Sequence, residues 1–462
     1  MRKWDRGSRD IHRLAGPRRR ANCEWLIDGK RVALMAYYAP EEETLDRERL
    51  AELQRRKLGQ LMDEIRASNK FYQGKIGDSA FDPTAGQLEQ LPLTTRSEIE
   101  RDQLDHPPYG SLLTYPLEQY TRLHETSGTS GAPLRWLDTK ESWNWLKHCW
   151  CIVYRGAGVT AEDRLIFPFS FGPFIGFWAA FEAATDLGNF CLPAGGMTTT
   201  ARLEYMLDHA VTVVCCTPTY ALRMAEVADR EGIDLRSSSV RLLIVAGEPG
   251  GSIPAVRSRI EEDWCACVID HVGMTEIGAY GFECVEAPGG LHVIESEFVA
   301  EVIDPTTCEV LPDGRVGELV LTNLGRRGSP LIRYRTGDQV LLTRDRCRCG
   351  RWFARIEGGI RGRLDDMLII RGNNVFPSAI EGLLREYREV SEFRLVVDRA
   401  GSMADLHIEV EPDPERDAGD LAQRIETSVR DRFHFKPRVT LVSAGSLPRF
   451  EMKARRLIRN DR

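Results

Sequence analysis

The sequence predicts an α/β protein with a large N-terminal domain and a small α+β C-terminal domain. Between residues 160 and 275, short apolar runs alternate with helical stretches, which is typical of a parallel sheet flanked by helices. After Gly290 the strand-like runs follow one another without helices, which predicts an antiparallel β subdomain. A chain of 462 residues is also too long for one compact core, so two or three domains are expected.

The elements of the large domain follow in order along the chain. Residues 1–36 form an N-terminal extension without clear periodicity. From Glu48 onward, apolar residues recur at a spacing near 3.6 and predict an amphipathic helix through Ile65. The parallel strands are expected at RLIFPF, VTVVCCTP, VRLLIVAG and ACVIDHVG, and the antiparallel strands at FVAEVID, GELVLTNL and DQVLLT.

The last hundred residues mix strand-like runs with two helical segments. The runs MLII, FRLVV, LHIEVE and VTLV are expected to be strands, and residues 378–387 and 418–433 are expected to be helices. The domain boundary is predicted within Gly362–Asp365. The chain therefore divides into an extension at 1–36, a large domain at 37–361 and a small domain at 362–462.

Charge and composition exclude some classes of protein. The chain has 62 basic and 69 acidic residues, a net charge of −7, which argues against a nucleic-acid binder and leaves small anionic ligands open. No apolar run approaches the roughly 20 residues that span a bilayer, and the basic start is not followed by a secretory signal. With 12 cysteines and no such signal, we expect a cytoplasmic protein in which clustered cysteines bind metal rather than form disulfides.

Six short motifs carry groups that suit a nucleotide or an anion. The loop Thr126–Pro133 (TSGTSGAP) combines glycines with hydroxyls that can surround phosphate oxygens, although it is not a Walker A loop. Each motif alone also fits an ordinary turn or a solvated charge, but six in this order indicate a ligand site. The others are Ala246–Gly251 (AGEPGG), Asp270–Glu276 (DHVGMTE), Arg333–Asp338 (RYRTGD), Gly362–Gly372 (GRLDDMLIIRG) and Leu447–Lys453 (LPRFEMK).

With these motifs the sequence resembles the adenylate-forming superfamily and, within it, the phenylacetate–coenzyme A ligase family. The resemblance extends from about Tyr37 to Arg462 and includes FYQGKIGD, LPLTTRSEI and GRLDDMLIIRGNNVFPSAIE. It implies that ATP activates a carboxylate to an acyl-adenylate and pyrophosphate, and that the thiol of coenzyme A then displaces AMP. It also implies that the C-terminal domain is mobile and changes pose between the two steps.

The resemblance assigns a role to individual residues. Lys453 is expected to bridge the carboxylate and the α-phosphate, Thr275 to contact the α-phosphate, and Glu276 to hold Mg²⁺. Asp365 corresponds to the hinge. The residues implied in binding ATP or AMP are Ser127, Gly128, Thr129, Ser130 and Gly131 at the phosphates, Glu248 beside the adenine, and Asp338 with Arg363 at the ribose.

Two positions depart from the family pattern. The phosphate loop has Ala132 where the family usually has a lysine, so one positive charge is missing. Val272 stands where the family has a tyrosine against the adenine, and His271 is a candidate to take part of that role.

A structural zinc site is also expected. Cys347 and Cys349 lie in RCRCGRW, and Cys284 and His292 flank the turn in FECVEAPGGLH. Three thiolates and one imidazole form a closed tetrahedral ligand set suited to zinc, and some family members resemble this pattern. The alternative is that these residues are reduced cysteines without a ligand.

The substrate is expected to be an aromatic carboxylic acid. The segment Phe167–Phe174 (FPFSFGPF) resembles the wall of an aryl pocket, although ordinary core packing explains it equally well. A hydrogen bond from His271 to a ring substituent would favour a hydroxy- or aminobenzoate. The predicted pocket residues are Phe169, Phe171, Gly172, Ala246, His271 and Gly273.

Two other functions remain open at this point. In one, the enzyme adenylates an acid and passes the acyl group to a carrier-protein phosphopantetheine or to an amine. In the other, the protein binds a nucleotide without catalysis, but the retention of Glu276, Asp338, Arg363 and Lys453 argues against this. The family resemblance also implies a homodimer as one expected assembly.

Overall fold

The computed structural model describes residues 26–27, 30–31, 37–77, 82, 88–126, 133–400, 403–451 and 453–460. Two compact units divide the chain, Met1–Leu34 and Met35–Arg462. In the first unit only a short antiparallel pair is described, β1 (Leu26–Ile27) with β2 (Lys30–Arg31). The predicted extension at 1–36 therefore lies mostly outside the described residues.

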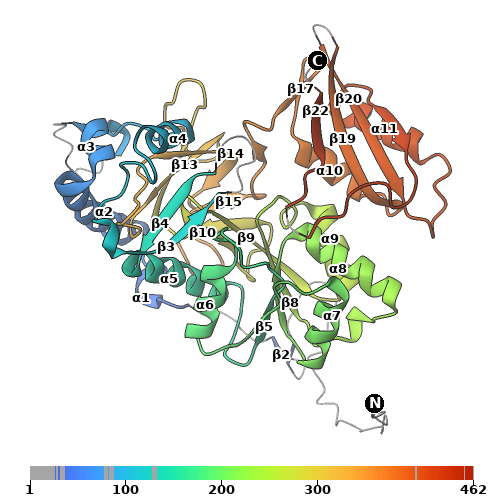
Figure 1. Ribbon diagram of the computed structural model, residues 1–462, viewed down its shortest axis with the longest axis horizontal. Helices are drawn as coiled ribbons and strands as arrows, with labels where there is room; N and C mark the ends of the chain where they lie inside the picture. The colour runs from blue at the N-terminus through green and yellow to red at the C-terminus, as the bar shows by residue number, and fades with distance from the viewer. Residues whose placement is uncertain are drawn as a thin grey trace. The chain divides into compact units, whose positions relative to one another are not determined.

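A twelve-stranded sheet forms the framework of the second unit (Figure 1). Its strand order is β12-β13-β14-β15-β11-β10-β9-β8-β7-β5-β6, and β16 pairs with β14. The five strands at one end are parallel, as the alternation of apolar runs and helices predicts. They are β5 (Arg164–Phe167), β6 (Phe190–Pro193), β7 (Val213–Cys216), β8 (Leu242–Ala246) and β9 (Cys267–Met274).

Helices cover both faces of the parallel part. Alternate strand residues such as Ile166, Val214 and Leu243 share one core with α7 (Thr199–Asp208), α8 (Pro218–Glu231) and α9 (Pro254–Trp264). The opposite face carries α5 (Lys140–Gly156) and α6 (Trp178–Asp186), which pack on each other. Because side chains alternate across a strand, strands buried on both faces are apolar throughout, which is why their sequences read as continuous hydrophobic runs.

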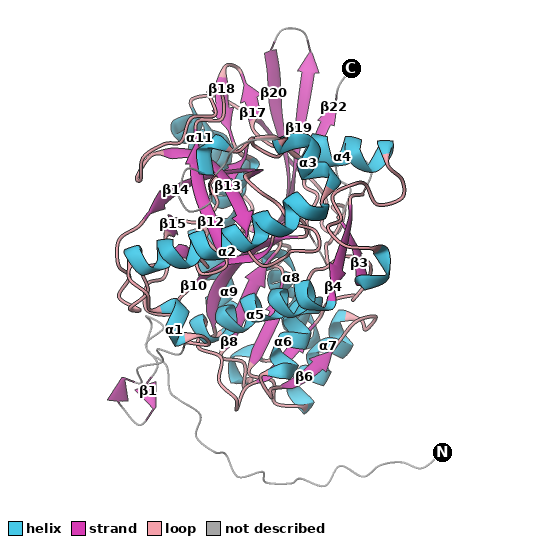
Figure 2. Cartoon of the chain, turned by 90° about the vertical axis from the view of Figure 1, so that its left-hand side faces the viewer, coloured by secondary structure: helices cyan, strands magenta, loops and turns pink. Residues whose placement is uncertain are grey.

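The antiparallel part continues the same sheet. β9 turns back into β10, and the strands from β10 onward pair antiparallel. The helix predicted from Glu48 is α2 (Arg47–Ser68), which crosses the antiparallel strands in Figure 2 and donates from Gln54 to the carbonyls of Glu295 and Phe298. The strands are β10 (Gly278–Glu283), β11 (Gly290–Val293), β12 (Phe298–Ile303), β13 (Val316–Asn323), β14 (Tyr334–Thr343), β15 (Arg355–Glu357) and β16 (Gly362–Arg363).

A second sheet of six strands forms the C-terminal α+β region, in the order β18-β17-β20-β19-β22 with β21 beside β20. Its buried face packs against α10 (Pro377–Arg385) and α11 (Leu421–Phe433). Because β16 still pairs with β14 of the large sheet, the link between the two sheets is residues 364–367, which contain Asp365. The strands are β17 (Leu368–Ile370), β18 (Asn373–Val375), β19 (Val390–Ala400), β20 (Met403–Pro412), β21 (Arg438–Leu441) and β22 (Leu457–Asn460).

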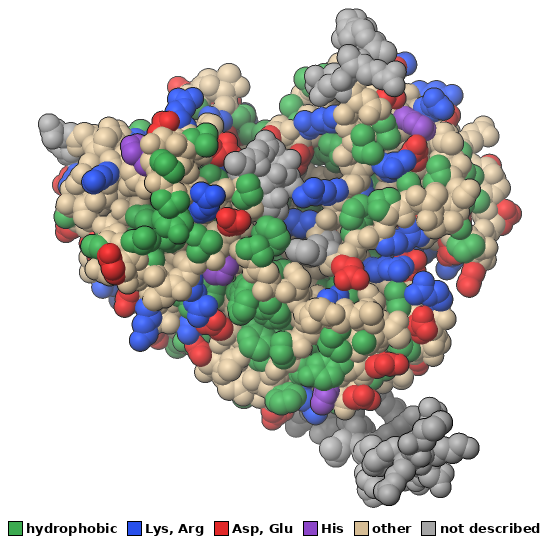
Figure 3. Space-filling view, in the orientation of Figure 1, with side chains coloured by type: hydrophobic (Ala, Val, Ile, Leu, Met, Phe, Trp, Pro, Cys, Tyr) green, Lys and Arg blue, Asp and Glu red, His purple; other side chains and the backbone are tan. Residues whose placement is uncertain are grey.

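Smaller elements complete the large region. They are α1 (Pro40–Glu43), α3 (Lys70–Ile76), α4 (Arg96–Asp105), the hairpin of β3 (Tyr120–Glu125) and β4 (Arg135–Thr139), and the short 3₁₀ turns η1 (Leu88–Gln90), η2 (Leu117–Gln119) and η3 (Leu235–Ser237). In the part of the chain that the structure describes, every helix is too short or too polar to cross a membrane. Basic and acidic side chains are intermixed over the face shown in Figure 3.

Candidate active site

The carboxyl ends of β8 and β9 bring several predicted site residues together. Ala246 and His271 are direct neighbours in this strand pair, and the AGEPGG motif follows Ala246. Glu248 accepts hydrogen bonds from the backbone N–H of Thr219 at 2.9 Å and of Ala454 at 2.8 Å. One carboxylate thus connects the start of α8 to the segment that carries Lys453.

Lys453 lies against the loop after β8. A β-carbon built on Gly247 would be 3.4 Å from Cε of Lys453, and Gly247 has a φ of +96°. The pKa of Lys453 is lowered because desolvation of its ammonium outweighs the attraction of Glu248 and Glu276. The ammonium is therefore within electrostatic range of two acidic groups of the predicted site.

The turn after β9 is held by two arginines. Arg326 is fully buried, pairs with both carboxylate oxygens of Asp138 at 2.7 Å, and donates to the backbone carbonyls of Thr275 and Glu276. Arg96 donates to Oε1 of Glu276 at 2.9 Å. The buried Arg326–Asp138 pair therefore fixes the backbone at Thr275 and Glu276, and Arg96 orients the carboxylate of Glu276.

Asp338 and Arg363 face each other across a strand pair. They are paired in register between β14 and β16, and Nη1 of Arg363 lies 3.6 Å from Oδ1 of Asp338. The hydroxyl of Tyr280 is 3.4 Å from Oδ2 of Asp338. Burial raises the pKa of Asp338 to about 6, against the opposing effect of Arg363. Asp365 is next to this pair and accepts from Nε of Arg363 at 3.1 Å.

The predicted phosphate-loop residues Ser127, Gly128, Thr129, Ser130 and Gly131, with Ala132, lie outside the described residues. The loop is closed at its base, where Thr126 exchanges hydrogen bonds with Leu134. Nη2 of Arg96 is 3.5 Å from Oγ1 of Thr126. Arg96 is therefore a cation between the base of this loop and Glu276.

The predicted aromatic wall is part of a larger set of rings. Phe169 contacts Phe177 at a centroid distance of 5.8 Å, Phe177 contacts Trp150 at 6.0 Å, and Trp150 contacts His271 at 4.2 Å. Phe171 turns toward α6, where it packs on Trp178 and Phe181. The carbonyl of Gly172 accepts from Nε1 of Trp178. The structure thus links Phe169 to His271 through rings from α5 and the start of α6.

The four predicted zinc ligands meet in one buried cluster. Their ligand atoms all lie within 4.8 Å of one another. Sγ of Cys284 is 3.8 Å from Sγ of Cys347, and Sγ of Cys349 is 3.4 Å from Nε2 of His292. Strand pairing places Phe282 of β10 beside His292 of β11, and Cys284 lies two residues after Phe282. The loop from β14 to β15 supplies Cys347 and Cys349.

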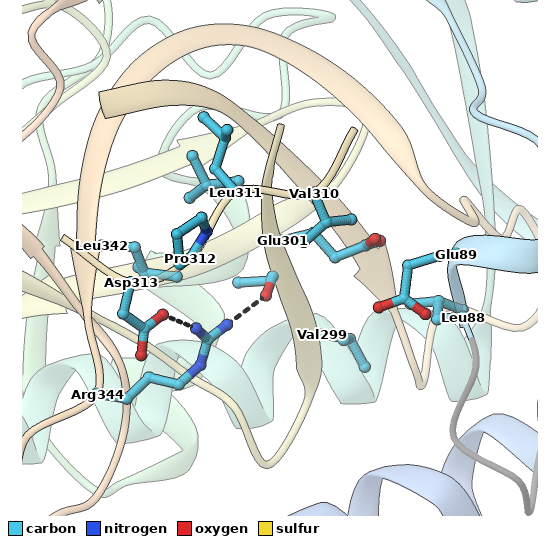
Figure 4. Close-up of a pocket in the computed structure, with 12 residues that line it drawn as sticks. Leu88, Glu89, Val299, Glu301, Val310, Leu311, Pro312, Asp313, Leu342 and Arg344 are labelled. Carbon is cyan, nitrogen blue, oxygen red and sulfur yellow. Dashed lines mark hydrogen bonds and ion pairs between the residues drawn. The ribbon is translucent and has the colours of Figure 1, made fainter. Parts of the chain in front are cut away.

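A cavity of about 310 Å³ lies away from these groups, between β12 and the turn at residues 310–313 (Figure 4). Three of its charged side chains are paired: Glu301 with Arg333, and Arg344 with Asp313, which also lines the cavity. None of the described site residues predicted from the sequence lines it. The candidate active site is therefore the group of residues at the carboxyl ends of β8 and β9, and not this cavity.

Sequence reasoning missed five residues of this region: Arg96, Asp138, Trp150, Phe177 and Arg326. Arg96 lies inside the LPLTTRSEI stretch, so its position in a motif that resembles the family could have identified it. The other four have no local signature, because their role depends on contacts with residues far away in the chain.

Comparisons with known proteins agree with this arrangement. Residues 123–325 match the AMP-binding enzyme family, and residues 372–461 match the AMP-binding enzyme C-terminal domain. The chain is 33% identical to phenylacetate–coenzyme A ligase of Thermus thermophilus, covering 90% of this chain and 97% of the relative. The corresponding ligase of Escherichia coli is 30% identical, over 90% of this chain and 96% of the relative.

Solved structures of a CoA ligase also match most of this chain. A 2-hydroxyisobutyryl-CoA ligase in the postadenylation state with 2-HIB-AMP is 28% identical, with a TM-score of 0.86 over 92% of each chain. The same ligase in the thioesterification state gives a TM-score of 0.69 over 91% of this chain and 92% of that one. The described arrangement is therefore more similar to the postadenylation state.

The fold and site define an adenylate-forming enzyme, an AMP-forming acid–thiol ligase that makes an acyl-CoA through an acyl-adenylate. Within that class, the chain belongs to the phenylacetate–coenzyme A ligase family.

Proposed function

We propose that the acid is aromatic, so that the protein is an aryl–CoA ligase. The observation that carries this is the continuous set of rings from Phe169 through Phe177 and Trp150 to His271, which reaches the carboxyl end of β9. Aromatic rings pack edge-to-face against one another and against a planar ligand, which favours an aryl group over a short alkyl chain. The names of the relatives in Thermus thermophilus and Escherichia coli support the same substrate class.

A short hydroxy acid is the second candidate. It is favoured by the TM-score of 0.86 to 2-hydroxyisobutyryl-CoA ligase. A panel of benzoates, phenylacetates and short hydroxy acids in ATP–pyrophosphate exchange separates the two. Higher kcat/KM for the aryl acids supports our proposal, and higher kcat/KM for the short acids refutes it.

The proposed reaction relies on positioned charge. The carboxylate of the acid attacks the α-phosphate and pyrophosphate leaves, while Lys453 neutralises the charge that develops on these oxygens. Thr275 contacts the α-phosphate, and Asp338 with Arg363 binds the ribose. Ser127 and the four residues after it hold the phosphates. Glu276 fits Mg²⁺ because its carboxylate supplies the oxygen ligands that this metal prefers, and the metal would neutralise phosphate charge.

The two halves of the reaction are proposed to use two poses of residues 362–462 relative to residues 37–361. Asp365, in the link between the two sheets, is the proposed hinge. Adenylation takes place while Lys453 is beside Gly247. The thioester step then follows with free coenzyme A. An acyl-adenylate that yields product only with a phosphopantetheinyl carrier protein, or with an amine, would refute free coenzyme A as the acceptor.

We also propose that the cysteine cluster holds a structural zinc ion. Around tetrahedral zinc, with Zn–S near 2.3 Å and Zn–N near 2.0 Å, neighbouring ligand atoms are about 3.5–3.8 Å apart. The distances of 3.8 and 3.4 Å in the cluster fit this geometry. Nδ1 of His292 is 3.2 Å from the carbonyl of Phe353, which leaves Nε2 for the metal, and the backbone N–H of Cys349 points to Sγ of Cys347.

A further inference from the structure

The imidazole of His271 is held in one tautomer. The ring is buried at the last residue of β9 that pairs with β8, and its Nδ1 is 2.8 Å from the carbonyl oxygen of Gly281. A carbonyl oxygen can only accept a hydrogen bond, so Nδ1 must carry the proton. In a neutral imidazole with a protonated Nδ1, the other nitrogen has a lone pair and accepts.

The surroundings of His271 favour the neutral ring. Burial lowers the pKa of His271 to about 4, and the hydrogen bond to Gly281 opposes this only in part. Trp150 packs on the ring at a centroid distance of 4.2 Å. Among the residues that the structure describes, none donates a hydrogen bond to Nε2 of His271. An acceptor is therefore left open within an aromatic wall.

Strand register connects His271 to the loop that lies against Lys453. A β-carbon built on Gly273 would lie 3.4 Å from Nε2 of His271 and only 2.9 Å from the carbonyl oxygen of Gly278, so a larger residue is excluded beside this atom. The neighbouring residue across the strand pair is Ala246, and a β-carbon built on the next residue, Gly247, would lie 3.4 Å from Cε of Lys453. An acid whose carboxylate is at Lys453 would extend along these small residues toward His271.

We propose that His271 selects acids that carry a hydrogen-bond donor, a hydroxyl or amino group, on the part of the acyl group remote from the reacting carboxylate. The choice of an aromatic acid rests on the proposed function, whereas the requirement for a donor rests on His271 itself. Because a buried acceptor left without a donor costs free energy, acids that lack the group are discriminated against.

The test compares acids that differ only in the donor. Hydroxy- and aminobenzoates are measured against methyl- and methoxybenzoates of similar size by ATP–pyrophosphate exchange, with the hydroxylated and unhydroxylated forms of a short aliphatic acid alongside. We expect the donor-bearing acid to have a kcat/KM about tenfold or more higher in the wild type. In His271→Phe this ratio falls to near one. His209→Phe, at an exposed position after α7, should keep the wild-type ratio.

The outcomes separate the two proposals. Equal kcat/KM for hydroxy- and methylbenzoate in the wild type overturns the role of His271 but leaves an aryl–CoA ligase. A donor preference seen only among aliphatic acids, and lost in His271→Phe, overturns the aromatic substrate but keeps the role of His271. A donor preference that survives in His271→Phe overturns the role of His271. His271→Gln keeps an acceptor, so it should show part of the wild-type kcat/KM ratio even if His271→Phe perturbs folding.

Discussion

Replacing Lys453 with alanine should abolish adenylation and spare thioester formation. In the described pose, Cε of Lys453 lies 3.4 Å from the position of a β-carbon on Gly247, and its ammonium interacts with Glu248 and Glu276. Without the ammonium, these carboxylates face the incoming acid and the α-phosphate with one cation fewer. The variant should therefore lose attraction at the reacting oxygens and also gain repulsion.

The size of the effect follows from the charge and its distance. A unit charge about 4 Å from a developing negative charge is worth about 4 kcal/mol at an effective dielectric constant near 20. Loss of one fixed donor at such a site costs roughly 2.7–4 kcal/mol, or about a hundredfold to a thousandfold in rate. We expect ATP–pyrophosphate exchange to fall by that factor.

The assay measures the two half-reactions separately. Conversion of supplied acyl-adenylate and coenzyme A to thioester should stay within about threefold of the wild type, because Lys453 is proposed to leave the site for that step. Arg455→Ala, two residues further along and exposed, is the matched control and should leave both steps unchanged. Near-normal exchange in Lys453→Ala would refute the assigned role.

Three further predictions concern metal, movement and pH. Purified protein should hold close to one equivalent of zinc, and Cys347→Ser should lower both the zinc content and the free energy of unfolding. Cys265→Ser, at an exposed position, should change neither. Protein that lacks zinc without ever having been exposed to a chelator would contradict this prediction. Asp365→Pro should affect the two half-reactions unequally, because proline fixes φ near −65° in the proposed hinge; equal loss of both in a stable variant would argue against it. Burial raises the pKa of Asp270 to about 7. The native state therefore keeps a proton that the unfolded state loses near pH 4. The contribution of Asp270 to stability is lost as pH rises between these two values. Urea unfolding should show Asp270→Asn gaining stability relative to the wild type from pH 4 to pH 7, by on the order of 2–4 kcal/mol, and a pH-independent difference would refute the shift.

Local structure and the order of the motifs can be predicted from the amino-acid sequence alone. Strands such as Leu242–Ala246 are continuous apolar runs because both faces are buried, and the helix Arg47–Ser68 shows a 3.6-residue period because one face is buried. The family resemblance then located the candidate ligands of ATP and zinc. The predicted strands and helix are confirmed because periodicity is a property of short segments, whereas the ligand assignments stay predictions.

Tertiary structure alone decided which distant residues meet. The parallel and antiparallel parts form one sheet because β9 reverses into β10, and no local pattern in either segment specifies that continuity. The same holds for Arg326, which is fully buried against Asp138, 188 positions earlier in the chain, and for Arg96, which reaches Glu276 across 180 positions. From its local segment alone, a charged residue is predicted to be exposed to solvent. Only the folded chain supplies the opposite charge that makes its burial favourable, so long-range packing, not local sequence, fixes these contacts.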